Sequence, residues 1–115
     1  MKQSPRAINL VSERELAATV RELARLYGWK QYSVLDTANP AVRTSTGWPD
    51  LFLVKGGQAL AVELKTENGG VRNDQDAWLE ALEQVPGIRC YVWRPRHLVN
   101  GEIEAILGDE ATNHG

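Results

Sequence analysis

Apolar residues recur at helical spacing in the first third of the chain. At about 100° per residue they share one face of a helix: Leu16, Val20, Leu23, Ala24 and Tyr27. Ser12, with Glu15 three residues later, forms the capping-box pattern that typically opens a helix. Gly28 is a typical residue for its end. The pattern therefore predicts a helix over 12–27, preceded by a flexible arm over 1–11.

Four shorter apolar runs predict β-strands. They cover residues 29–35, 50–54, 59–64 and 88–93. Gly56-Gly57, between the second and third runs, is typical of a two-residue hairpin turn. Both faces of this hairpin carry apolar side chains, so we expect helices to cover both of them.

Two further helices complete the expected elements. A helix over 74–84 is expected to begin after an Asn73 cap and to end before Pro86. Asn100 is expected to cap a short helix that runs through Leu107.

The order helix, three strands, helix, strand, helix predicts an α/β protein with a mixed central sheet flanked by helices. We place one domain over 12–107, between the flexible arm and a disordered acidic tail over 108–115. The chain's 115 residues are enough for one packed core and too few for a second large domain. Apolar residues at 43% and charged residues at 24% exclude a wholly disordered chain.

Composition also narrows the class of function. No run approaches the roughly 20 apolar residues of a membrane helix, and residues 1–10 lack the apolar core of a secretory signal. The single cysteine, Cys90, excludes a disulfide framework and a cysteine-based zinc site, and favours the cytoplasm. The net charge of −2 argues against a general nucleic-acid coat protein. It still permits DNA binding if acids sit at a metal and bases line a surface.

Three charged residues converge at the open end of the predicted hairpin. With Gly56-Gly57 as the turn, Asp50 lies directly opposite Glu63, their Cβ atoms roughly 4.5–5.5 Å apart. Lys65 lies two residues beyond Glu63 and therefore shares the same face of the strand.

Two carboxylates held this close repel one another unless a cation or a proton compensates. Oxygen ligands favour Mg²⁺ or Mn²⁺, which would gather a phosphate and activate a water. Lys65 would orient that water or neutralise the phosphate. The alternative is a surface ion pair of Glu63 with Lys65, and Asp50 as a turn residue. We favour the metal site because Pro49-Asp50 and Glu63-Leu64-Lys65 fall in register.

Two more polar residues fall on helix faces that point toward this site. Glu13 lies within the apolar face of the first helix, whereas Glu15 points away from it. Glu13 would be a further ligand of the metal or its water; the alternative is a solvated first-turn acid favoured by the helix dipole. Gln75 begins the apolar face of the second long helix, and its amide would hold a phosphate, a water or Lys65. The alternative for Gln75 is a polar first-turn residue in solvent.

The chain resembles a known nuclease family in these and in neighbouring segments. Pro49-Asp50 followed by Glu63-Leu64-Lys65 is the PD-(D/E)xK nuclease signature. Around this signature the chain is similar to the virus-type replication–repair nuclease (VRR-NUC) domain over roughly residues 12–95. The similar segments are 12–13, 22–29, 47–51, 63–67, 75–79 and 91–95.

This resemblance implies a fold, a chemistry and a set of site residues. It implies the αβββαβ core of the restriction-endonuclease-like fold, and hydrolysis of phosphodiester bonds in DNA with Mg²⁺ or Mn²⁺. The matching catalytic residues are Glu13, Asp50, Glu63, Lys65 and Gln75, of which Glu13, Asp50 and Glu63 would bind the metal. The chain departs from the family at Ala17, where the family often has Gln.

The resemblance also implies partners. Stand-alone members of this size, often from phages, are similar to Holliday junction resolvases and tend to be homodimers. We therefore expect branched DNA as substrate, a homodimer, and the cytoplasm of a bacterium or phage-infected host, with no membrane and no small-molecule cofactor. The candidate DNA contacts lie in loops around the site and after the last strand: Arg43, Thr44, Ser45, Thr46, Arg72, Arg94 and Arg96.

Two other functions stay open from the sequence. The same fold would also serve as a catalytically inert module that binds DNA or a partner protein, although an inert site has no need for paired acids. A restriction-like or RNA-directed nuclease is the third alternative, but 115 residues leave little room for a sequence-reading element.

Overall fold

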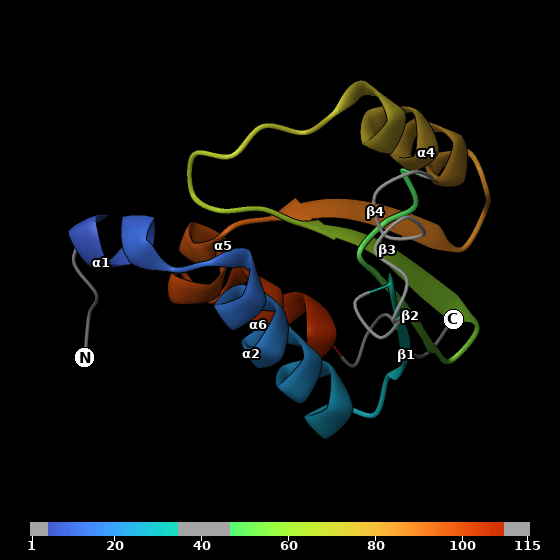
Figure 1. Ribbon diagram of the computed structural model, residues 1–115. Coiled ribbons are helices and arrows are strands. Elements are labelled where there is room, and N and C mark those ends of the chain that lie inside the picture. Colours follow the sequence, from blue (N-terminus) through green and yellow to red (C-terminus); the bar gives the residue numbers. More distant parts are fainter. Residues whose placement is uncertain (1–4, 35–46, 110–115) are drawn as a thin grey trace.

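The computed structural model describes residues 5–34 and 47–109. These residues form one four-stranded mixed sheet with helices on both of its faces (Figure 1). Its strands are β1 (Lys30–Ser33), β2 (Leu51–Lys55), β3 (Gln58–Leu64) and β4 (Ile88–Trp93). Its helices are α1 (Pro5–Leu10), α2 (Glu13–Leu26), α4 (Asn73–Glu83), α5 (Pro95–Val99) and α6 (Glu102–Leu107). The succession α2, β1, β2, β3, α4, β4 confirms the predicted restriction-endonuclease-like core.

The sheet has the strand order β1-β2-β3-β4. The first three strands are antiparallel neighbours, and β4 pairs parallel with β3 after the crossover through α4. In the β2–β3 hairpin, Leu51 lies opposite Val62 and Lys55 opposite Gln58, as predicted. The two residues of the turn, Gly56 and Gly57, have φ of 58° and 78°, which residues with a Cβ rarely adopt.

The main core lies between the sheet and the layer formed by α2 and α6 (Figure 1). The apolar face of α2 contributes Leu16, Val20 and Ala24, all fully buried. The sheet contributes alternate residues of its central strands: Leu51, Leu53, Leu60, Val62 and Leu64. Trp29, which lies between α2 and β1 in the sequence, is bonded to α6, because its indole N–H donates to the Leu107 carbonyl oxygen over 2.9 Å.

Helix α4 covers the opposite face of the sheet, along β3 and β4 (Figure 1). Trp48 packs there between two aromatic rings, with Phe52 at 5.7 Å and Trp78 edge-on at 5.0 Å between ring centroids. Trp78 keeps 40% of its surface exposed. Helices therefore lie on both faces of the sheet, as the apolar side chains on both faces of the hairpin predicted.

The helix starts were predicted with mixed success. The capping box of α2 is confirmed: Glu15 N–H donates to Ser12 Oγ over 3.1 Å, and Ser12 N–H to Glu15 Oε1 over 3.0 Å. Asn73 was wrong as the cap of α4, whose N-cap is Arg72. Asn100 was also wrong as the cap of α6, whose N-cap is Gly101, although its Oδ1 accepts the N–H of Glu102 over 2.9 Å.

Two short helices were not predicted. Residues 5–10, inside the expected flexible arm, form α1, which packs beside α5. Pro95 follows the end of β4 and begins α5, since its fixed φ suits the first helical turn. Helices of five or six residues are too short to show a hydrophobic period. No helix in the described ranges is long and apolar enough to span a membrane.

Candidate active site

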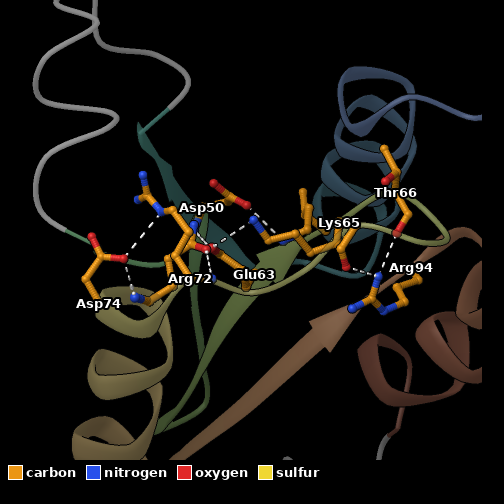
Figure 2. Close-up of polar contacts among 10 residues, drawn as sticks. Asp50, Glu63, Lys65, Thr66, Arg72, Asp74 and Arg94 are labelled. Atoms are coloured by element: carbon orange, nitrogen blue, oxygen red, sulfur yellow. Dashed lines mark hydrogen bonds and ion pairs between the residues drawn. The ribbon is translucent and has the colours of Figure 1, made fainter.

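The two acids predicted to meet extend the β2–β3 ladder beyond its last backbone pair. The Asp50 N–H donates to Glu63 Oε1 over 3.1 Å, and the Leu64 N–H donates to Asp50 Oδ2 over 2.8 Å. Side-chain oxygens thus accept hydrogen bonds across the open end of the hairpin (Figure 2). These two bonds fix both carboxylates relative to the sheet.

Glu63 is the most constrained member of the pair. Its side chain is fully buried, and its Oε2 has no hydrogen-bond partner among the described residues. Burial raises the pKa of Glu63 to about 8, and the negative charge of Asp50 adds to the effect, while Lys65 opposes it. At neutral pH this site therefore favours either a proton or a cation on Glu63.

Lys65 supplies the nearest positive charge. Its Nζ lies 3.9 Å from Glu63 Oε2, which is ion-pair distance but too long for a hydrogen bond. Only 11% of the Lys65 side chain is exposed, so this is not the surface ion pair of the alternative interpretation. The Lys65 N–H donates to the Trp93 carbonyl oxygen over 3.0 Å, which extends the β3–β4 pairing by one residue.

The paired acids suit a divalent cation. A buried carboxylate oxygen without a partner, beside a second carboxylate, offers the hard oxygen ligands that Mg²⁺ and Mn²⁺ take. Within residues 5–34 and 47–109, no three His, Cys, Asp or Glu side chains cluster closely enough to hold a metal. Asp50 and Glu63 would therefore hold the ion, with water or phosphate oxygens as further ligands, as is common for Mg²⁺.

Glu13 lies near this site without joining the carboxylate pair. It is the exposed first residue of α2, and it lines a cavity of about 340 Å³ together with Asp50 and Leu64. The expected orientation of Glu13 toward the site agrees with this position. Its role as a third metal ligand stays a prediction.

Gln75 has a structural partner at the start of α4. Its side chain is buried, and its Oε1 accepts the N–H of Arg72 over 3.1 Å, so it caps the helix from inside the first turn. Arg72 also forms an ion pair with Asp74, with 3.3 Å between Nε and Oδ1 (Figure 2). Contact of Gln75 with the reacting groups stays a prediction.

Gly47 joins the segment before Asp50 to the same helix start, a contact that sequence reasoning missed. Its φ is 72°, and a Cβ there would lie 2.7 Å from the Asp74 carbonyl oxygen. Only glycine combines this backbone angle with so close an approach. The glycine directly before Trp48-Pro49 was the available signal.

Arg94 holds the turn that follows β3. Its Nη1 donates to the Thr66 carbonyl oxygen at 2.8 Å (Figure 2), and to the carbonyl oxygens of Glu67 at 3.3 Å and Gly69 at 2.6 Å. Arg96 reinforces the turn, because its backbone N–H and its Nη1 bind the Glu67 carboxylate over 3.1 and 3.0 Å. Both arginines therefore fix the chain where it leaves the Glu63-bearing strand.

Three of the residues predicted to contact DNA lie in the described part of the chain, and four do not. Arg72, Arg94 and Arg96 each make the protein contacts given above, and DNA binding by them stays a prediction. Arg43, Thr44, Ser45 and Thr46 lie outside the described residues.

The fold and the carboxylate–carboxylate–lysine group have the arrangement expected of the PD-(D/E)xK signature, and the family comparison indicates a nuclease of this type. The family model of the VRR-NUC domain matches residues 8–96, most of the chain. The chain therefore belongs to the VRR-NUC family, as its motifs indicated. Neither the curated proteins nor the solved structures contain a match to it.

Proposed function

We propose that this protein is a divalent-metal-dependent endonuclease that hydrolyses phosphodiester bonds in DNA. One observation carries the proposal: Glu63 Oε2 is buried without a hydrogen-bond partner beside Asp50 and 3.9 Å from the Lys65 ammonium. A structural role alone would favour an apolar residue at so buried a position, because an unpaired buried carboxylate destabilises the fold.

The reaction replaces one oxygen on phosphorus by another. A water loses a proton and its oxygen forms a bond to phosphorus, while the bond to the leaving ester oxygen breaks and that oxygen takes up a proton. A bound divalent cation lowers the pKa of water and stabilises negative charge on phosphate oxygens. The chain's own residues must supply the rest.

Asp50 and Glu63 would hold the cation at a position that is set before the substrate arrives. Each carboxylate already accepts one backbone N–H, so neither side chain has to reorganise on binding. Lys65 would place its ammonium against the attacked phosphate or the attacking water. Its low exposure strengthens that interaction, since less solvent screens the charge.

Glu13 and Gln75 complete the proposed machinery. Glu13 would bind a water of the cation from the α2 side of the cavity. Gln75 keeps the start of α4, and with it Arg72, in place beside the site.

For the substrate we propose branched DNA, including four-way junctions, cut by a homodimer. One domain carries one carboxylate pair, and symmetric cutting of a junction requires two such sites in one assembly. The proposal for the dimer follows from the resemblance to junction-resolving members of the family.

The test is cleavage of labelled four-way junction, flap, single-stranded and linear duplex DNA in Mg²⁺, Mn²⁺ or EDTA. We expect metal-dependent cuts that Glu63→Gln and Lys65→Met abolish, while both variants keep the wild-type fold by circular dichroism. Paired symmetric cuts in the junction, with a dimer mass from light scattering, would support the finer proposal. Cuts in flaps or single strands would retain the nuclease and discard the resolvase.

A matched control is Lys55→Met, at the other end of the same hairpin. It removes an equivalent charge far from the carboxylates and should leave cleavage unchanged. Binding of DNA without cleavage in either metal, by a folded protein, would contradict the enzyme and favour the inert binding module.

A further inference from the structure

The cavity beside Asp50 has a basic wall. Its volume is about 340 Å³, at the lower end of the range for ligand sites in proteins. It is lined by residues of α2 and by Asp50 and Leu64, which lie directly before β2 and at the end of β3. Arg14 and Arg21 both line it from α2.

The spacing along α2 places these residues on one stripe. Arg14, Ala18 and Arg21 follow the i, i+4, i+7 pattern of neighbouring positions on a helix surface. At about 1.5 Å per residue, the two arginines lie roughly 10 Å apart along the helix axis. Ala17 and Ala18 line the cavity between them, and their short side chains leave the helix surface open.

Arg21 is oriented by the neighbouring strand. Its Nε donates to Gln31 Oε1 of β1 over 3.4 Å, and Gln31 Nε2 donates to the Arg21 carbonyl oxygen over 3.0 Å. This contact limits the conformations of the side chain, so less entropy is lost when its guanidinium binds a ligand. Arg14, one residue into the helix, is exposed to solvent.

The charges divide the cavity into two ends. At one end, Asp50 and Glu13 repel an anion unless a cation lies between the anion and these carboxylates. At the other end, Arg14 and Arg21 attract an anion directly. We infer that this cavity binds the backbone of the DNA strand being cut, with Arg14 and Arg21 on phosphates that flank the one at Asp50. The inference rests on the proposed function and adds the surface that holds the substrate strand.

Arg25 provides the matched control. It lies on the same helix but does not line the cavity, and its Nη2 lies 2.6 Å from Glu22 Oε2 in an exposed ion pair. Loss of its charge changes the net charge of the protein by the same amount as loss of Arg14.

The experiment measures binding of a fluorescent single-stranded DNA oligonucleotide in EDTA at several salt concentrations. Arg14→Ala and Arg21→Gln should each weaken binding roughly 3- to 10-fold and reduce the salt slope by about 0.7, the loss of one phosphate contact on a single strand. Ala18→Leu should weaken binding by filling the cavity while both arginines remain. Arg25→Ala should bind as the wild type does.

Two outcomes separate the inference from the proposed function. Equal affinities and salt slopes for Arg14→Ala, Arg21→Gln and Arg25→Ala would overturn the inference, even if the protein cleaves DNA. Arginine-dependent binding without any cleavage in Mg²⁺ or Mn²⁺ would support the strand-binding cavity and contradict the nuclease. Urea denaturation of each variant checks the fold, and Arg21→Gln keeps an amide that can still donate to Gln31.

Discussion

The two ends of the β2–β3 hairpin close in different ways. At one end Gly56 and Gly57 reverse the chain with positive φ, and the flanking Lys55 pairs with Gln58 as strand partners do. At the other end, carboxylate oxygens of Asp50 and Glu63 accept the N–H groups that would otherwise continue the ladder. The turn end closes through strand pairing of Lys55 with Gln58, whereas the open end leaves a buried oxygen without a partner.

Lys55 and Lys65, at the two ends of this hairpin, also differ in how completely their ammonium groups are paired. Lys55 Nζ donates to the Tyr27 carbonyl oxygen over 2.5 Å and lies 5.8 Å from the centroid of the Trp29 ring. Lys65 instead stands 3.9 Å from a buried carboxylate, beyond hydrogen-bond reach. Incomplete pairing at one end only is typical of a functional site in an otherwise consistent fold. Stabilising contacts and the candidate catalytic groups therefore lie at opposite ends of one pair of strands.

The largest effect is expected from removing one charge at the open end. Asp50→Asn keeps an oxygen that can accept the Leu64 N–H but loses the negative charge. We expect cleavage to fall by about 10³-fold or more, because electrostatic binding of the cation is lost. Single-turnover cleavage measures this, with Gln58→Ala at the turn as control. Asp50→Asn with near wild-type activity would remove Asp50 from the site.

The second effect concerns the stability of the metal-free protein as pH changes. The pKa of Glu63 rises from 4.5 in the unfolded chain to about 8 in the folded one, so folding favours the protonated form. This contribution is complete below pH 4.5 and is lost as pH rises through about 8. We expect the free energy of unfolding to fall by about 2–4 kcal/mol across that window.

Urea denaturation in EDTA at a series of pH values measures this loss. Glu63→Gln should show a much flatter dependence, because it cannot ionise at that position. Saturating Mg²⁺ should reverse the slope, since the cation binds the deprotonated carboxylates. A wild-type stability that rises from pH 5 to 8 in EDTA would contradict the buried, protonated Glu63.

The smallest effect is expected at the turn. A Cβ at Gly57 would meet no atom within 4 Å, so Gly57→Ala adds only the strain of its φ of 78°. We expect the free energy of unfolding to drop by about 1 kcal/mol, with cleavage unchanged. Thermal denaturation beside the cleavage assay measures both. A large loss of activity in Gly57→Ala would mean that the two ends of the hairpin are coupled.

The hairpin and its acids could be predicted because the governing interactions are local. A two-residue turn fixes the register, and the register alone places Asp50 opposite Glu63. The start of α2 was predictable for the same reason, because the capping box of Ser12 and Glu15 spans only three residues.

The contacts that escaped prediction join distant parts of the chain. Arg94 reaches back 28 residues to Thr66, which requires the β3–β4 pairing to be known first. Gly47 touches Asp74 only because α4 crosses above the sheet. The N-cap of α4 was predicted wrongly for a different reason. The Gln75 side chain accepts the Arg72 N–H from within the helix, so the polar Asn73 was not needed as a cap.

The hydrogen bonds that join Asp50 to Glu63 and to Leu64 have a consequence for the kinetics of folding. The two residues are 13 apart in sequence, so they meet as soon as the hairpin closes, on a timescale of about 1–10 μs for such a structure. The crossover through α4 that brings Trp93 beside Lys65 closes a longer loop and forms more slowly. We expect the repulsion between the acids to lower the population of closed hairpins from which the slower crossover proceeds above neutral pH, and stopped-flow refolding of Asp50→Asn to be faster there than that of the wild type. The acids proposed to cut DNA would then also set how quickly each new chain reaches its native state.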